Sequence, residues 1–185
     1  QAFDAKVRRV LAAGGPPRDE VQAHVDAVHA AAQAVREIDE AYEAGRHAER
    51  HLAAALERIR ILEDEEVATM TVFMASMSSM AWGSTTATAL EIHLERAQAY
   101  VRRYIRELAD VPVRVGPRWR GDFLQAFVQL VVGFGTERAR KAKTMIEQVL
   151  HEVRRTQMVL TQLRGEALAR HEQASWRYTA AVERA

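Results

Sequence analysis

Apolar residues recur at alternating steps of three and four along most of the chain, which is the spacing of one face of a helix. In the first half the pattern extends over about 60 residues, a length typical of coiled-coil or long-bundle helices. Gly45 interrupts it and leaves two alternatives: a helix that continues through the glycine at a cost of about 1 kcal/mol, or a hairpin that turns there. The apolar positions are Val21, Val25, Val28, Ala32, Val35, Ile38, Tyr42, Ala48, Leu52, Ala55, Ile59, Leu62, Met70, Met74, Met77 and Ala81.

The most regular part of the pattern lies between residues 136 and 184, where no proline occurs. A continuous helix over these residues would be roughly 70 Å long at 1.5 Å per residue. Breaks are predicted at GGPP (14–17), at Gly83 and at 111–121, a stretch that holds two prolines and two glycines. After the first break, Asp19 and the glutamate that follows it favour the start of a helix.

These elements predict an all-α fold, an elongated bundle of about four to five helices with coiled-coil-like long helices. Helix-forming residues dominate the composition, and strand-like alternation is confined to the short VPVRV at 111–115. We expect a single helical domain over 1–185. It would comprise an N-terminal segment (1–17), long helices (18–110), a loop (111–121) and C-terminal helices (122–185).

Charge is balanced over the whole chain, at a net +1, but it is distributed unevenly. Residues 18–66 carry 13 acidic and 6 basic side chains, whereas residues 137–185 carry 10 basic and 6 acidic ones. We interpret this asymmetry as two long helices that pack side by side with complementary flanks. The basic residues alternate with glutamates around the helix, so nucleic acid is not expected as a partner.

Two uncharged stretches stand out in a chain that is 28% charged. Residues 67–90 are long enough to cross a membrane, but nine of them are serine or threonine, so we interpret them as a buried central helix in which methionines fill gaps. Residues 123–135 are too short to span. Two alternatives stay open for these stretches, insertion into a membrane and contact with a partner helix. The candidate residues are Met70, Phe73, Met74, Met77, Met80, Trp82, Trp119, Phe123, Phe127 and Phe134.

Reactive side chains do not form a recognisable site in the sequence. The chain has no cysteine, which excludes disulfides and thiol chemistry. His47 and His51 are one helical turn apart, as two metal ligands would be, but no matching ligand pair recurs on another predicted helix, so we interpret them as part of a solvated face. Phosphate-binding glycine loops and nucleophile motifs are missing from the sequence. We therefore expect no enzymatic activity, no cofactor and no metal.

Trp119, Arg120 and Gly121 form a W-x-G tripeptide, followed by Ala126 and Phe127 on the next predicted helix. This stretch resembles the turn of WXG100-type proteins, small helical hairpins exported by type VII secretion. The resemblance covers residues 119–127 and implies a secreted helical protein. The Y-x-x-x-[DE] tail of that family is not matched, because the residue four positions after Tyr178 is a valine.

The sequence favours a non-enzymatic protein that acts through helix–helix association with itself or with another helical protein. The alternative is a membrane-perturbing or secreted helical effector, such as a pore-forming protein, a translocator or a type VII-like substrate, that uses 67–90 and 123–135. No signal peptide or convincing transmembrane helix is recognisable in the 185 residues, so cytoplasmic and secreted locations both stay open.

Overall fold

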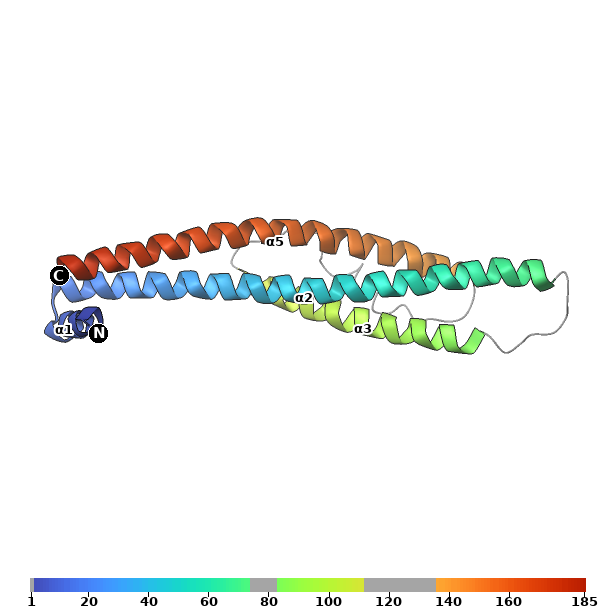
Figure 1. Ribbon diagram of the computed structural model, residues 1–185, viewed down its shortest axis with the longest axis horizontal. Coiled ribbons are helices and arrows are strands. Elements are labelled where there is room, and N and C mark those ends of the chain that lie inside the picture. The colour runs from blue at the N-terminus through green and yellow to red at the C-terminus, as the bar shows by residue number, and fades with distance from the viewer. Residues whose placement is uncertain (1, 74–82, 112–135) are drawn as a thin grey trace. The chain divides into compact units, whose positions relative to one another are not determined.

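The computed structural model describes residues 2–73, 83–111 and 136–185, with side chains at 3–61, 92–111 and 143–185. Of the described residues, 97% are helical and none is in a strand. The four helices are α1 (Ala2–Ala13), α2 (Pro16–Phe73), α3 (Gly83–Asp110) and α5 (Thr136–Arg184) (Figure 1). The prediction of an all-α bundle is confirmed.

The first two helices are separated by Gly14 and Gly15, whose φ angles are 71° and 79°. Glycine adopts this left-handed region without the steric penalty of a side chain. Pro16 then opens α2, where its fixed φ suits the first turn and its missing N–H costs no helical hydrogen bond. The carbonyl oxygen of Gly15 accepts the backbone N–H of Arg18 at 3.0 Å. The predicted break at GGPP is confirmed.

The two longest helices are α2, with 58 residues, and α5, with 49. Helix α2 continues through Gly45, so the hairpin alternative is wrong at that position. Helix α5 covers the residues for which a continuous helix was predicted. Residues on both helices divide between two compact units, which we call unit 1 (Gln1–Glu40 and Leu160–Ala185) and unit 2 (Ala41–Val159).

Unit 2 contains three described helical segments, from α2, α3 and α5, and side chains from all three form its core. Helix α3 runs alongside α2 there (Figure 1). The core side chains follow the spacing of three and four predicted from the sequence. Those with a relative exposure of 3% or less are Ala41, Ala44, Ala48, Leu52, Ala55, Ile59, Leu94, Ala97, Val101, Tyr104, Ile146, Val149 and Val153.

Unit 1 contains α1 and the remaining parts of α2 and α5. Its buried cluster joins the three helices through Val10 on α1, Val21 on α2, and Ala181 and Val182 on α5. Phe3 packs edge-on against the ring of Tyr178, with 5.9 Å between the ring centroids. These contacts place α1 against the first turns of α2 and the last turns of α5 (Figure 1).

Three ion pairs join an acid on α2 to an arginine on α5. In unit 1, Glu20 pairs with Arg184 at 2.9 Å and Asp39 with Arg164 at 2.6 Å; in unit 2, Glu49 pairs with Arg154 at 2.7 Å. The residue numbers in each pair add up to 203 or 204, so the same antiparallel register holds within each unit. The interpretation of the charge asymmetry as complementary flanks of two long helices is confirmed by these contacts.

Candidate functional site

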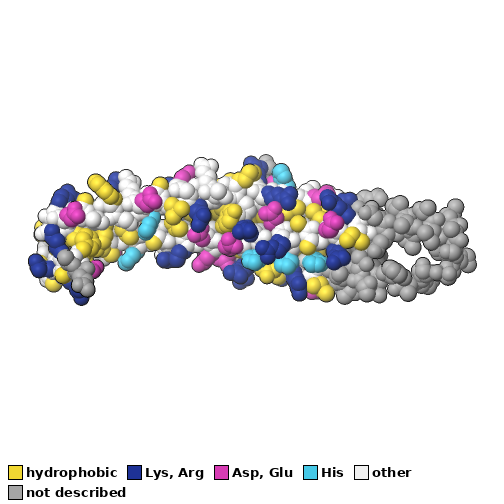
Figure 2. Space-filling view, in the orientation of Figure 1, with side chains coloured by type: hydrophobic (Ala, Val, Ile, Leu, Met, Phe, Trp, Pro, Cys, Tyr) yellow, Lys and Arg dark blue, Asp and Glu magenta, His cyan; other side chains and the backbone are white. Residues whose placement is uncertain are grey.

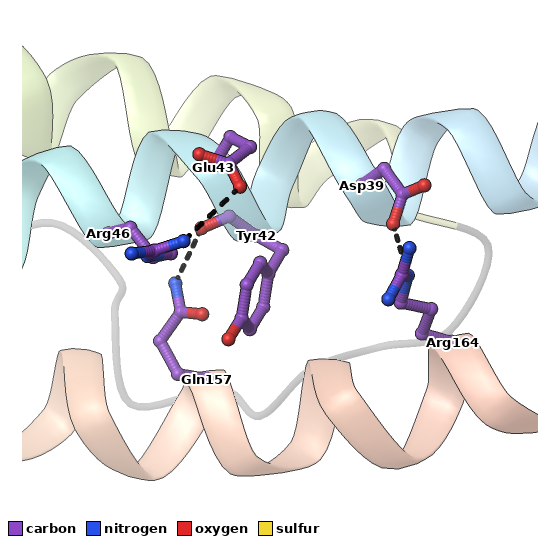
Figure 3. A network of polar contacts seen from close by, with 6 residues as sticks. All are labelled: Asp39, Tyr42, Glu43, Arg46, Gln157 and Arg164. Carbon is purple, nitrogen blue, oxygen red and sulfur yellow. Dashed lines mark hydrogen bonds and ion pairs between the residues drawn. The ribbon is translucent and has the colours of Figure 1, made fainter.

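A polar layer crosses the core of unit 2 at Gly45. The side-chain amide of Gln157, on α5, donates a hydrogen bond to the backbone oxygen of Tyr42, on α2, at 3.0 Å (Figure 3). Tyr104 reaches the same place from α3, and burial raises its pKa above the usual range, while hydrogen bonding by Thr156 and Gln157 opposes the rise. A fully buried phenol and a buried amide are costly unless they are bonded, so this layer favours one alignment of the three helices.

Gly45 is the position that allows this close approach. A Cβ atom on Gly45 would overlap the side-chain nitrogen of Gln157 and would lie 2.8 Å from the Tyr104 ring. The sequence shows that a glycine within this helix is costly, but it does not show why a glycine is needed there. It is needed because Tyr104 on α3 and Gln157 on α5 fill the space that any other side chain at position 45 would occupy.

Histidines and a tyrosine form a second cluster in unit 2, between α2 and α3. The rings of His47 and His51 both lie nearly parallel to the ring of Tyr100, with centroid distances of 5.2 Å and 4.7 Å. His93 lies beside His51 at a centroid distance of 6.4 Å. These four side chains are half-buried, so the interpretation of His47 and His51 as a fully solvated face is corrected: Tyr100 covers them.

Burial lowers the pKa of His51, and the positive charges of nearby side chains lower it further. The strongest of these comes from Arg96, followed by His93, Arg50 and His47. Among the residues that the structure describes, no group of three or more His, Asp or Glu side chains could hold a metal ion. The cluster is therefore a stacked, electropositive contact between two helices.

A third feature is a small-residue face of α2 that differs between the two units. Residues 41, 48 and 55 occupy one heptad position and residue 44 another, and all four are buried alanines. His51 shares the heptad position of Ala44 and stacks on Tyr100, so this is the face that α3 covers. In unit 1 the same two heptad positions hold Ala23, Ala27 and Ala30, which are exposed, and Ala34, which is half-buried, together with Glu20 and Glu37.

The α2–α5 contact in unit 1 is correspondingly less enclosed. Val25, Val28 and Val35 continue the apolar pattern of α2 but are only half-buried. On α5, Leu168 is 41% and Trp176 is 76% exposed. Single exposed apolar residues are ordinary on protein surfaces. Here they lie in the same unit as the exposed alanines of α2, and unit 2 likewise exposes Ile92, Met158 and Val159.

The ten interface and membrane-insertion candidates from the sequence all lie outside the described side chains. Met70 and Phe73 belong to α2, but their side chains lie outside the described set. The other eight candidates, Met74, Met77, Met80, Trp82, Trp119, Phe123, Phe127 and Phe134, lie outside the described residues, as does the W-x-G turn. Within the described residues, no helix is both long and apolar enough to cross a membrane.

Sequence reasoning missed two groups of residues that the structure brings together. His93 and Tyr100 are seven residues apart, the spacing of one helix face, and this signal would have placed them together. The alanines of α2 carry a similar heptad signal.

Comparisons with protein-family models, curated proteins and solved structures find no match to this chain.

Proposed function

We propose that this protein is a non-enzymatic association module that uses the first part of α2 to bind a further helix. The observation that carries the proposal is the alanine face of α2, which α3 covers in unit 2 and which is open at Ala23, Ala27 and Ala30 in unit 1. Alanines allow two helix backbones to approach closely, and the neighbouring half-buried valines offer apolar area that a partner would remove from water.

The simplest partner is a second copy of the chain. A two-fold dimer uses the same surface on both subunits. The alanine face of α2 can pack against a second copy of itself, because it needs no complementary protruding side chain elsewhere on the molecule. The gain from association comes from the apolar area that the half-buried valines and alanines still expose. A different helical protein would use the same face in the same way.

Sedimentation velocity over a wide range of protein concentrations tests this proposal. We expect self-association of the unaltered chain, and its weakening in the double variant Ala27→Glu/Ala30→Glu, because the new carboxylates would be buried at the contact. The matched control is Ala53→Glu/Ala99→Glu, which alters two exposed alanines of unit 2. Circular dichroism should show equal helix content in both variants, since glutamate is a good helix former.

Two results would contradict the proposal of self-association. The first is a chain that stays monomeric at every concentration. The second is a dimer that both double variants weaken equally, because the contact would then lie elsewhere. A monomer that nevertheless binds an added helical protein, with the binding lost only in Ala27→Glu/Ala30→Glu, would assign the same face to a different partner.

A further inference from the structure

The contact between α2 and α3 in unit 2 contains three histidine side chains. His47 and His51 lie one turn apart on α2, and both stack on Tyr100 of α3. His93, also on α3, lies beside His51. In Figure 2, histidine side chains lie among Lys and Arg side chains where α2 and α3 run alongside each other. Three imidazoles thus share one half-buried contact.

The charges around His51 all have the same sign. From α3 it is influenced by Arg96 and His93, and from α2 by Arg50 and His47. No carboxylate, from α2, α3 or α5, is among the described charges that act on it. Arg50 and Arg96 also form no ion pair with a described acid, unlike Arg154 and Arg164 elsewhere on the bundle.

His93 has a further constraint. Its Nδ1 atom is buried and has no hydrogen-bond partner among the described residues. A proton added to the nearby His51 ring would place charge close to Arg96 and Arg50, in a site that water reaches only in part. The charged form of His51 is therefore disfavoured, because like charges repel at short range.

We propose that His51 makes the contact between α2 and α3 acid-sensitive. Stacked on Tyr100 and beside His93, it holds α3 on α2 while its imidazole is neutral and loosens α3 when it takes up a proton. The site is a regulatory device within unit 2. It does not depend on whether the chain associates through unit 1.

The sign of the effect follows from linkage. The pKa of His51 is lower in the folded chain than the ordinary value of 6.5, first because of burial and then because of the surrounding cations. The unfolded chain, or a chain with α3 detached, binds the proton more readily. The contribution of the contact to stability is therefore fully present above about pH 6.5 and is lost as the pH falls from there through the pKa of the folded state.

Hydrogen exchange of the α3 backbone (Gly83–Asp110) measures this loosening directly. We expect protection in α3, corrected for the intrinsic effect of pH on exchange, to fall between pH 7.5 and pH 5.5 in the unaltered chain. The variant His51→Gln/His93→Gln should keep its protection over that range, because glutamine does not titrate. His171→Gln, on α5 in unit 1, is the matched control and should lose protection in α3 like the unaltered chain.

A second pair of variants leaves the histidines in place. Arg96→Glu replaces the strongest repulsive charge by an attractive one at an exposed position, so it should reduce the acid loss of α3 protection. Arg102→Glu, at another exposed position of α3, should leave the loss unchanged. Because the interaction is electrostatic and partly exposed, raising the salt concentration should also reduce the loss.

The proposal is overturned if α3 of the unaltered chain is equally protected at pH 7.5 and pH 5.5. It is also overturned if Arg96→Glu and Arg102→Glu lose the same protection in acid, since the loss would then come from another group. If His51→Gln/His93→Gln does not fold, a proton NMR titration of the unaltered chain decides the matter. A histidine signal that titrates in step with the loss of α3 protection supports the proposal, and histidines that all titrate without it refute it.

Discussion

The two units of this protein use the same helix, α2, in different surroundings. In unit 2 the apolar positions of α2 are covered by α5 on one side and α3 on the other, and Leu52 and Ile59 are completely buried. In unit 1 the apolar pattern of α2 continues with Val28 and Val35, which are half-buried, although Val21 and Ile38 are buried there. The comparison teaches that the heptad pattern of a sequence specifies which face is apolar, whereas the number of neighbouring helices decides how far that face is removed from water.

The difference extends to the kind of residue at each contact. Unit 2 has a polar layer, with Tyr104 and Gln157 meeting at Gly45, whereas unit 1 has a small apolar cluster at α1; both units have ion pairs between α2 and α5. Buried polar groups require one alignment, because a shifted helix would leave them unbonded. We therefore expect unit 2 to tolerate substitution poorly and unit 1 to tolerate it well.

Truncation of one core residue in each unit gives the largest expected contrast. Leu52→Ala should lower the free energy of unfolding by about 2–5 kcal/mol, because the side chain is fully buried. Val28→Ala should lower it by roughly 1 kcal/mol, since part of its surface already meets water. Urea unfolding, followed by hydrogen exchange in each unit, measures both. Equal losses would show that the two surroundings do not differ energetically.

The glycines of the two long helices give a contrast of opposite sign. Gly45→Ala should destabilise unit 2 by about 1–3 kcal/mol, because the new methyl group meets Gln157 and the Tyr104 ring. Gly165→Ala, on α5 in unit 1, should stabilise the helix by about 0.5–1 kcal/mol, since nothing lies within 4 Å of the added atom. Thermal unfolding of the two single variants should shift in opposite directions. A gain in stability for Gly45→Ala would mean that the polar layer rearranges freely.

The ion pairs between α2 and α5 should have the smallest effect. Asp39→Asn and Glu49→Gln each remove one pair whose side chains are about half exposed, so each should cost less than about 1 kcal/mol and less still in high salt. Double-mutant cycles with Arg164→Gln and Arg154→Gln, respectively, isolate the two pair energies. A coupling above about 2 kcal/mol in either unit would show that register is held by charge rather than by packing.

Much of the fold was predictable because its determinants are local in the sequence. The glycine and proline pair at 14–17 predicts the boundary of α1 and α2 from backbone sterics alone. The apolar spacing predicts α5 over its full length. The opposite charge excess of 18–66 and 137–185 predicts that these segments lie together, and the ion pair of Glu20 with Arg184 confirms the pairing.

The candidate sites were less predictable because they depend on which helix lies next to which. The sequence of α2 alone predicts that His47 and His51 are solvated. They are half-buried because Tyr100 on α3 stacks on both rings. The role of Gly45 likewise requires Gln157 and Tyr104, which are more than 50 residues away in the chain. A heptad pattern predicts which face of each helix is buried, but not which helix covers that face. Contacts that involve three helices therefore cannot be predicted from the pattern.

The packing of α1 against the last turns of α5 has a mechanical consequence. Lys6 donates to the backbone oxygen of Glu183 at 2.8 Å, and Val10 shares a cluster with Val182, so α1 and the last turn of α5 are held together in one small patch of unit 1. A pulling force applied between α1 and the last turn of α5 would load that patch first. The force would then separate α2 from α5 progressively, from the ion pair of Glu20 with Arg184 toward that of Asp39 with Arg164. At each step only the few contacts at the point of separation would resist the force.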